Sequence, residues 1–273
     1  PPLRGEGRAH AAITILNGTA TGVGCSLAIE GGVEATWQRM SAPSFRSDPP
    51  CDDALVTSVR RIVGDGTASV RTRSTFPSSR GLKTSSSAAA ALLRAAHASR
   101  GEPVDDAILV PLAVKACRDA GVTLTGALDD QLAVVRGGCH LADSRTGKRL
   151  RSFDVQPLAV AVWVPDRAIP KSAVRNIPTA AVERDIAQLA SDLDADSLGD
   201  TLTANGRLFT RLYAAAGLPV SKEPARVALA AGALGAGLSG TGPAVAALFG
   251  KRVKLPDLTG GRWAWTRTIL ETR

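Results

Sequence analysis

The chain has 273 residues, which is enough for one large domain or for two small domains that share an interface. Hydrophobic residues make up 44% of it and aromatic residues only 4%, so its core is expected to consist mainly of Ala, Val, Leu and Ile. The formal charge of +8 favours anionic partners, but the basic residues are scattered, which argues against a basic nucleic-acid-binding arm and fits a nucleotide and a small acid.

Strand patterns dominate the beginning of the chain. They predict two strands within 10–30 on either side of the small-residue turn 17–24, further strands at 33–39 and 68–75, and a loop at 43–53. After Ser87 the pattern changes to a helical period. It predicts helices at 88–98 and 107–120, and the acidic pair Asp105-Asp106 precedes the second of these.

An apolar run at 158–165 is suited to a buried strand, and a second lobe is expected to begin near Asp154. The elements predicted after this strand are helices at 180–193, 200–216 and 224–233, a turn and strand at 242–249, and an edge strand at 263–271. The chain is therefore predicted to form two domains, 1–153 and 154–273.

Several other classes of protein are disfavoured. The four cysteines, at positions 25, 51, 117 and 139, lack the spacing of metal ligands, and the three histidines form no metal set and no hydrolase triad. The chain starts without a signal segment and has no apolar run of roughly 20 residues, as a membrane helix requires. We therefore expect a cytoplasmic protein that is not bound to a membrane.

One segment points to phosphate chemistry. Residues 77–88 read Pro-Ser-Ser-Arg-Gly-Leu-Lys-Thr-Ser-Ser-Ser-Ala, a glycine turn followed by hydroxyls and an alanine-rich helix start. Glycine lets the backbone approach a ligand closely, and free amides at a helix N-terminus attract an anion. The alternative is an ordinary loop in which Ser or Thr caps the helix.

Three segments together carry a family resemblance. They are Gly-Leu-Lys-Thr-Ser-Ser at 81–86, Thr-Gly-Ala-Leu-Asp-Asp at 125–130 and Leu-Ser-Gly-Thr-Gly-Pro at 238–243. In order and spacing they resemble the GHMP kinase superfamily, whose phosphate loop is usually Gly-Leu-Gly-Ser-Ser. Lys83 at the third loop position, followed by serines, is similar to the archaeal-type shikimate kinases, and the resemblance spans roughly residues 8–270. A Walker loop is absent.

This resemblance implies a two-lobed α+β GHMP fold with mixed and antiparallel sheets and a cleft between the lobes. It implies that ATP, with Mg²⁺, phosphorylates the 3-hydroxyl of shikimate in aromatic amino-acid biosynthesis. Homoserine kinase, or another small-molecule kinase of this superfamily, is the nearest alternative. A non-catalytic relative that binds nucleic acid is a further alternative, although no nucleic-acid partner is expected.

The resemblance also implies catalytic residues. Asp130, followed by Gln131 and then by Gly137-Gly138, matches the aspartate that takes or orients the proton of the acceptor hydroxyl, and Asp129 is its competitor. Lys83 is expected to contact the nucleotide phosphates or the substrate carboxylate.

The remaining site residues are expected by the same resemblance. The predicted ATP-binding and phosphate-binding residues are Pro77, Arg80, Gly81, Leu82, Lys83, Thr84, Ser85, Ser86, Ser87, Gly240 and Gly242. The predicted substrate-binding residues are Thr14, Asn17, Asp130, Ser239, Thr241 and Arg267. Ser85 and Asp119, which lies 11 residues before Asp130, are the predicted metal ligands.

Overall fold

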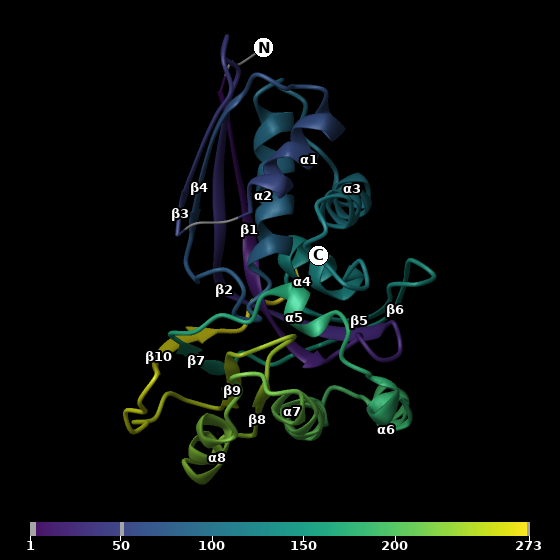
Figure 1. Ribbon diagram of the computed structural model, residues 1–273, viewed down its shortest axis with the longest axis vertical. Coiled ribbons are helices and arrows are strands. Elements are labelled where there is room, and N and C mark those ends of the chain that lie inside the picture. The colour runs from purple at the N-terminus through teal and green to yellow at the C-terminus, as the bar shows by residue number, and fades with distance from the viewer. Residues whose placement is uncertain (1–3, 50–51, 272–273) are drawn as a thin grey trace.

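Two separate β-sheets organise the residues that the structure, a computed structural model, describes, 4–49 and 52–271 (Figure 1). Helices pack against both sheets, so the predicted α+β character with two sheets is confirmed. Cys51, the start of the first predicted domain and the end of the second lie outside the described residues. No described helix is long and apolar enough to cross a membrane.

The first sheet comes from the first part of the chain. Its strands are β1 (Arg4–Leu16), β2 (Val23–Gln38), β3 (Ser44–Asp48), β4 (Ser69–Ser74), β5 (Cys139–Asp143) and β6 (Lys148–Phe153). The order is β3-β4-β2-β5-β6, and β1 pairs with β2 in antiparallel register. One half of β2 pairs with β5 and the other half with β4, so β2 is the centre of this sheet.

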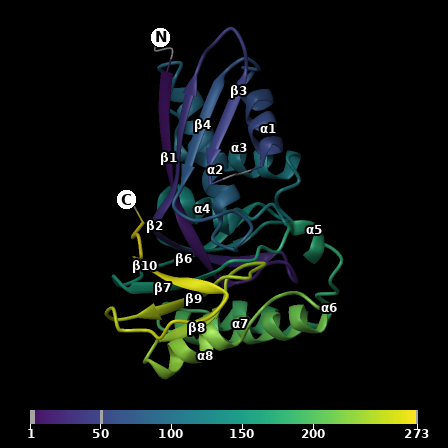
Figure 2. The same cartoon turned by 60° about the vertical axis from the view of Figure 1, so that its left-hand side comes forward.

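The second sheet is smaller and antiparallel. Its strands are β7 (Ala159–Pro165), β8 (Gly235–Leu238), β9 (Val245–Phe249) and β10 (Gly261–Arg267), in the order β10-β7-β9-β8. The predicted apolar strand is β7, which lies inside the sheet, and the predicted edge strand is β10. In Figure 2 this sheet lies between the first sheet and the helices α7 (Leu198–Ala215) and α8 (Glu223–Ala230).

The alanine-rich helix α2 (Thr84–Ala98) lies directly against β1. A Cβ added at Gly7 would lie 2.2 Å from the carbonyl oxygen of Ala91, and one at Gly5 would lie 2.2 Å from that of Ala95. The glycines on the strand and the alanines on the helix therefore allow a backbone approach that larger side chains would block. This contact positions the N-terminus of α2.

Other helices surround α2 or follow β7 in the chain. They are α1 (Asp53–Val63), α3 (Asp106–Asp119), α4 (Leu128–Arg136), α5 (Lys171–Val174) and α6 (Ala180–Asp192). The predicted helices at 107–120 and 180–193 correspond to α3 and α6, and Asp105 caps α3 by accepting a hydrogen bond from the N–H of Ala107 at 2.7 Å.

The structure corrects three expectations for the first part of the chain. The segments expected as separate strands at 24–29 and 33–39 form one strand, β2, which passes through Gly31 and Gly32 at positive φ. The segment 43–53, expected as a loop, contains β3. The helices α1 and α4 and the β5–β6 hairpin were not predicted.

One hydrophobic cluster joins the two sheets. Ile13 and Leu27 from the first sheet, Val160 and Leu248 from the second, and Phe209 from α7 belong to the same buried cluster. The first sheet therefore contributes to the core that supports the second sheet, across the predicted boundary at 153/154.

Candidate active site

Three loops that lie far apart in the sequence meet in space. The backbone N–H of Thr14 donates to Ser239 Oγ at 3.0 Å, and that hydroxyl donates to the carbonyl of Gly81 at 2.7 Å. Gly81 has φ +88°, and a Cβ there would lie 2.0 Å from the carbonyl oxygen of Ser239. Only glycine allows this approach, so the loop at 81–87 and the loop at 238–243 are held together.

The helix α2 begins directly after Lys83, whose backbone has φ +59°. This left-handed conformation is easy for glycine and costs other residues roughly 1–2 kcal/mol, which accounts for the glycine that phosphate loops of this type usually carry here. The first N–H groups of a helix lack partners within the helix and attract anions. Thr84, Ser85 and Ser86 add hydroxyls to the same turn.

The helix α4 supplies two buried carboxylates in its first turn, Asp129 and Asp130. Lys83 Nζ lies 2.7 Å from Asp130 Oδ1, and each of these two side chains is 11% exposed. Removing either partner would leave the other side chain with little access to water and no ion-pair partner, so each holds the other in place. The two predicted catalytic side chains therefore form an ion pair.

A serine on β2 links the two carboxylates. Ser26 Oγ lies 2.8 Å from Asp129 Oδ2 and 2.7 Å from Asp130 Oδ1. A hydroxyl has only one proton to donate, so both contacts are hydrogen bonds only when one of the carboxyls holds a proton. Burial, and then the charge of Asp130, raise the pKa of Asp129 to about 7. The raised pKa makes Asp129 the better candidate to hold that proton, while Asp130 is the carboxyl paired with Lys83.

A second lysine faces this group. Lys171 begins α5 and lines the same space as Lys83 and Asp130. Burial, and then repulsion by the charge of Lys83, lower the pKa of Lys171. Because two ammonium groups lie close together beside the two carboxyl groups, a bound anion would stabilise the site further.

Two cavities meet at this group. The Ser85 cavity, of about 360 Å³, is lined by Ser79, Gly81, Leu82, Thr84, Ser85 and Ser86 among others. The narrower Asn17 cavity is lined by Thr14, Asn17, Thr19, Thr123, Thr125 and Asp129 among others. Both are lined by Lys83, Asp130, Lys171, Gly240 and Thr241. The Lys83–Asp130 ion pair thus lies where a group could pass from one cavity to the other.

The predicted substrate residues Thr14 and Asn17 differ in whether their side-chain polar atoms already have hydrogen-bond partners. Asn17 Nδ2 donates to the carbonyl of Gly240 at 2.9 Å, and its Oδ1 accepts from the N–H of Thr19 at 3.0 Å, so its amide shapes the cavity wall. Thr14 Oγ1 is buried and has no hydrogen-bond partner among the described residues. An unpaired buried hydroxyl at a cavity wall is available to a bound molecule.

Several predicted phosphate-binding residues support the loop from outside the Ser85 cavity. Arg80 donates to the carbonyls of Pro165 and Asp166 at 2.8 and 2.6 Å, and its neighbour Pro77 lines a different cavity. The N–H of Gly242 donates to the carbonyl of Ser239 at 2.9 Å and so closes the turn of that loop. These contacts support the loop, and the predicted phosphate contacts of these residues stay predictions.

Ser87 also supports the local structure. Its hydroxyl donates to the carbonyl of Ala9 and accepts from the N–H of Val33, both at 2.9 Å, and the residue is fully buried. The serine cluster therefore divides at this position, because Ser85 and Ser86 line the cavity while Ser87 ties α2 to β1 and β2.

Two predicted substrate residues also lie elsewhere. Ser239 is fully buried, and its hydroxyl is occupied by the contacts to Thr14 and Gly81, so it acts as a link between loops. Arg267 is exposed on β10 and pairs with Glu30 at 3.1 Å, and among the described residues it lines neither cavity of the site.

The predicted metal ligand Asp119 lies apart from Ser85, and its role stays a prediction. Its carboxylate lies 2.7 Å from Lys115 Nζ and 3.1 Å from Arg61 Nη2. The hydrogen bond from Lys115 holds the pKa of Asp119 below its usual range. Asp119 lines a third cavity, whereas Ser85 lines the cavity beside Asp130. The structure therefore does not bring the two predicted metal ligands into one site.

Sequence reasoning missed Ser26, Lys171, Thr123 and Thr125. Ser26 gives little signal, because it is a single hydroxyl within an apolar strand. Thr123 and Thr125 directly precede the Asp129-Asp130 motif, and this position was a usable signal. Lys171 lies in a four-residue helix far from every recognised motif.

Comparison with known proteins supplies the family. The protein-family model for the GHMP kinases N terminal domain matches residues 54–138, and the family model for the GHMP kinases C terminal domain matches residues 185–256. The two matched ranges together cover more than half of the chain. A protein named shikimate kinase from Halobacterium salinarum is 37% identical over 261 residues, covering 90% of this chain and 88% of that protein. Another from Pyrococcus abyssi is 30% identical over 257 residues, covering 90% and 92%.

Solved structures show the same fold. The homoserine kinase from Cytophaga hutchinsonii has a TM-score of 0.75 at 16% identity, covering 98% of this chain and 96% of that one. The mevalonate kinase of L. major, solved with R-mevalonate, has a TM-score of 0.75 at 17% identity, covering 99% and 98%. The fold, the two matched family models and the relatives over nine tenths of its length agree, and the chain belongs to the GHMP kinase superfamily, among proteins named shikimate kinase.

Proposed function

We propose that this protein is an ATP-dependent shikimate kinase, which converts shikimate and ATP to shikimate 3-phosphate and ADP in aromatic amino-acid biosynthesis. The observation that carries the proposal is the Lys83–Asp130 ion pair at the junction of the Ser85 and Asn17 cavities. The relatives named shikimate kinase support the choice of substrate.

ATP would bind with its phosphates in the Ser85 cavity. The N-terminal amides of α2 and the hydroxyls of Thr84, Ser85 and Ser86 suit phosphate oxygens. Lys83 and Lys171 would offset negative charge that accumulates on the transferred group, which is the main contribution that a protein makes to phosphoryl transfer.

Shikimate would bind in the Asn17 cavity with its 3-hydroxyl toward Asp130. The hydroxyl oxygen attacks the γ-phosphorus, the bond from that phosphorus to the oxygen shared with the β-phosphate breaks, and the hydroxyl proton passes to Asp130. Ser26 and Lys83 hold the accepting carboxylate in place.

Mg²⁺ fits this arrangement. It takes oxygen ligands, keeps several waters, and needs only one or two protein groups beside ATP phosphates. The described residues contain no group of three or more His, Cys, Asp or Glu that could hold a metal. The Ser85 cavity nevertheless offers hydroxyl oxygens of Thr84 and Ser85 and the carboxylate of Asp130, which are hard donors of the required kind. Bound Mg²⁺ would neutralise phosphate charge.

The charges of the site favour an acceptor with a carboxylate and no ammonium group. Lys83 and Lys171 line the Asn17 cavity and attract a carboxylate, while they repel a cation such as the ammonium of homoserine. The hydroxyls of Thr14, Thr123 and Thr125 suit the ring hydroxyls of shikimate.

The test is ADP release with ATP and Mg²⁺ in the presence of shikimate, homoserine, mevalonate or galactose. We expect release with shikimate alone. Release with homoserine alone would overturn the substrate while keeping the kinase chemistry, and no release with any acceptor would overturn the proposal. Adding excess EDTA should stop the reaction and adding Mg²⁺ should restore it, whereas activity that persists in EDTA would contradict the role given to the metal.

A further inference from the structure

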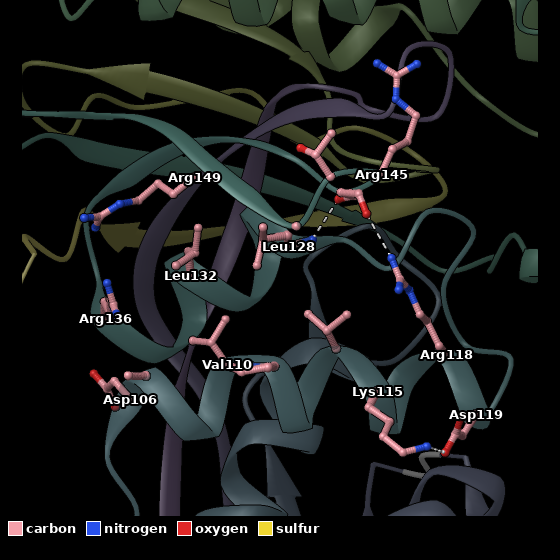
Figure 3. Close-up of a pocket in the computed structure, with 16 residues that line it drawn as sticks. Asp106, Val110, Lys115, Arg118, Asp119, Leu128, Leu132, Arg136, Arg145 and Arg149 are labelled. Atoms are coloured by element: carbon pink, nitrogen blue, oxygen red, sulfur yellow. Dashed lines mark hydrogen bonds and ion pairs between the residues drawn. The ribbon is translucent and has the colours of Figure 1, made fainter.

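A large pocket lies outside the candidate active site. It is a pocket of about 720 Å³ between α3, α4 and the turn of the β5–β6 hairpin, here called the α3–α4 pocket (Figure 3). It shares no lining residue with the Ser85 or Asn17 cavity. Its volume is in the range of small-molecule sites, and no step of the proposed reaction uses it.

The α3–α4 pocket has an apolar middle and cationic ends. Figure 3 shows Val110, Leu128 and Leu132 in its middle, with Arg136 and Arg149 toward one end and Arg118 and Arg145 toward the other. Pro111 and Val114 extend the apolar lining, and Lys115 adds a further cation. An apolar body with attached acidic groups matches this arrangement.

The charge of the pocket is not balanced by its own carboxylates. Its acidic lining residues are already engaged, since Asp106 pairs with Arg94 and Asp119 pairs with Lys115 and Arg61. Arg145 pairs with Asp143, and Arg149 pairs with Glu271. Counted with these ion-pair partners and without Arg136, six cationic side chains face four carboxylates, an excess of two positive charges. Such an excess attracts an anion.

Arg118 is the cation best placed to bind it. Its Nη2 donates to the carbonyls of Ser144 and Thr125, at 2.9 and 3.2 Å. Among the described residues no carboxylate lies within 4.0 Å of it, so its charge is met only by neutral carbonyls. Because a guanidinium carries five N–H donors, Nε and Nη1 remain to bind an acidic group without breaking these two bonds.

The same residue connects the pocket to the active site. Ser144, whose carbonyl accepts from Arg118, also accepts from the N–H of Leu128 through its hydroxyl at 3.0 Å. Leu128 is the first residue of α4 and directly precedes Asp129 and Asp130. Thr125, the other acceptor of Arg118, lines the Asn17 cavity. An anion on Arg118 would therefore hold the segment that positions the carboxylates.

We propose that the α3–α4 pocket is a second ligand site, which takes a small organic anion with an apolar body and a carboxylate, sulfonate or phosphate group. Occupation of this site steadies the segment 121–130 through Arg118 and Ser144. The proposal goes beyond the proposed kinase function and does not depend on the identity of the acceptor.

The test uses 8-anilinonaphthalene-1-sulfonate, which is an apolar anion, and its uncharged analogue N-phenyl-1-naphthylamine. Both are titrated by fluorescence in the presence of a non-hydrolysable ATP analogue, which competes for the phosphate site. The test variant combines Arg145→Glu with Arg149→Glu, whose side chains are 66% and 42% exposed. The matched control combines Arg184→Glu with Arg252→Glu, two exposed arginines outside the pocket.

We expect the test variant to weaken binding of the sulfonate at least tenfold and the control variant to change it less than twofold. Binding of the uncharged analogue should be the same in all three proteins. Equal sulfonate binding in the test and control variants, or equal loss of the uncharged analogue, would overturn the proposed recognition.

Hydrogen exchange measures the coupling independently of activity. The sulfonate should slow exchange of the segment 121–130 in the unaltered protein, where the N–H of Leu128 bonds to Ser144, and should not do so in the test variant. Unchanged exchange in the unaltered protein at saturating sulfonate would overturn the link between the α3–α4 pocket and α4.

Discussion

Lys83 combines a strained backbone with a charge that the site uses, and two substitutions separate these effects. Lys83→Gly and Lys83→Ala both remove the ammonium that pairs with Asp130, so both should lower turnover at least 100-fold. Only glycine relieves the left-handed backbone at φ +59°. We expect the Gly variant to be about 1 kcal/mol more stable to urea than the Ala variant. Equal stabilities, or turnover close to that of the unaltered enzyme, would contradict this interpretation.

Asp130 is the proposed proton acceptor, and Asp130→Asn keeps its shape while removing its basicity. We expect turnover to fall by about 10²–10⁴-fold while the affinity for ATP changes little. Turnover and ATP binding by calorimetry are measured on the same preparation. Substantial turnover by the Asn variant would remove Asp130 from the role of base.

Asp129 should make stability depend on pH. Its folded pKa of about 7 lies above its ordinary value of 3.8, so the stability linked to its proton is fully present below about pH 4 and is lost as the pH rises through about 7. Asp129→Asn stays neutral throughout. The melting temperature of the Asn variant minus that of the unaltered protein should therefore increase between pH 5 and pH 8. The corresponding change in the free energy of unfolding is on the order of a few kcal/mol. A difference that stays constant with pH would contradict the raised pKa.

Among single site residues, the sequence predicted those that belong to a motif and missed those that lie outside every motif. Lys83 and Asp130 could be predicted because a glycine turn and an acidic pair mark their loops. Ser26 and Lys171 reach the site only because β2 and α5 fold against α4, and pairing between distant segments leaves no local pattern. Within the described part of the chain, Arg267 lines neither cavity of the site, and sequence does not tell which face of an edge strand reaches it.

At the scale of the elements, the position of α2 depends on its close backbone contact with β1. In Gly7→Ala the new Cβ would lie 2.2 Å from the carbonyl oxygen of Ala91, so α2 must shift away from β1. We expect a loss of about 1–3 kcal/mol in the free energy of unfolding and a higher KM for ATP, because the N-terminus of α2 moves with the helix. Gly66→Ala is the control, since a Cβ there meets nothing within 4 Å. Equal effects of the two substitutions would contradict the close packing of α2.

The longer helices found from sequence have a regular pattern. The helices α3, α6 and α7 could be predicted because each spans at least 13 residues. The helix α4 was missed because the residue before it, Ala127, adopts φ +49° and provides no side-chain cap that would mark the helix start. The strand β3 is short, with exposed and half-buried residues in alternation, and so resembles a loop in composition.

The shared hydrophobic cluster makes the whole molecule one cooperative unit. Phe209 on α7 is 1% exposed and belongs to the cluster that also contains Ile13 and Leu27 of the first sheet. Phe209→Ala should lower stability by about 3–5 kcal/mol. We expect calorimetry to show one transition that shifts as a whole to lower temperature. A scan that separates into two transitions, with only one of them shifted, would indicate independent lobes.

The division into domains 1–153 and 154–273 stays a prediction. The sheets follow that division, since the first is built within residues 4–153 and the second within 159–267. The core does not follow it, because apolar residues of β1 and β2 pack on both sides of the boundary. The sequence pattern predicted the position in the chain after which strands belong to the second sheet. It gave no indication that the strands β1 and β2 contribute residues to two hydrophobic cores.

The long β1–β2 pair also limits how substrates reach the site. β1 contributes Ala9 and Ala12 to one core and Ile13 to the other, so a hinge rotation between the sheets would have to bend a paired strand within its own ladder. We therefore expect access to the site to come from movement of a connecting loop, chiefly the segment 121–127. The two sheets should keep their relative position during turnover, and the rate at which ADP leaves should be set by this short segment.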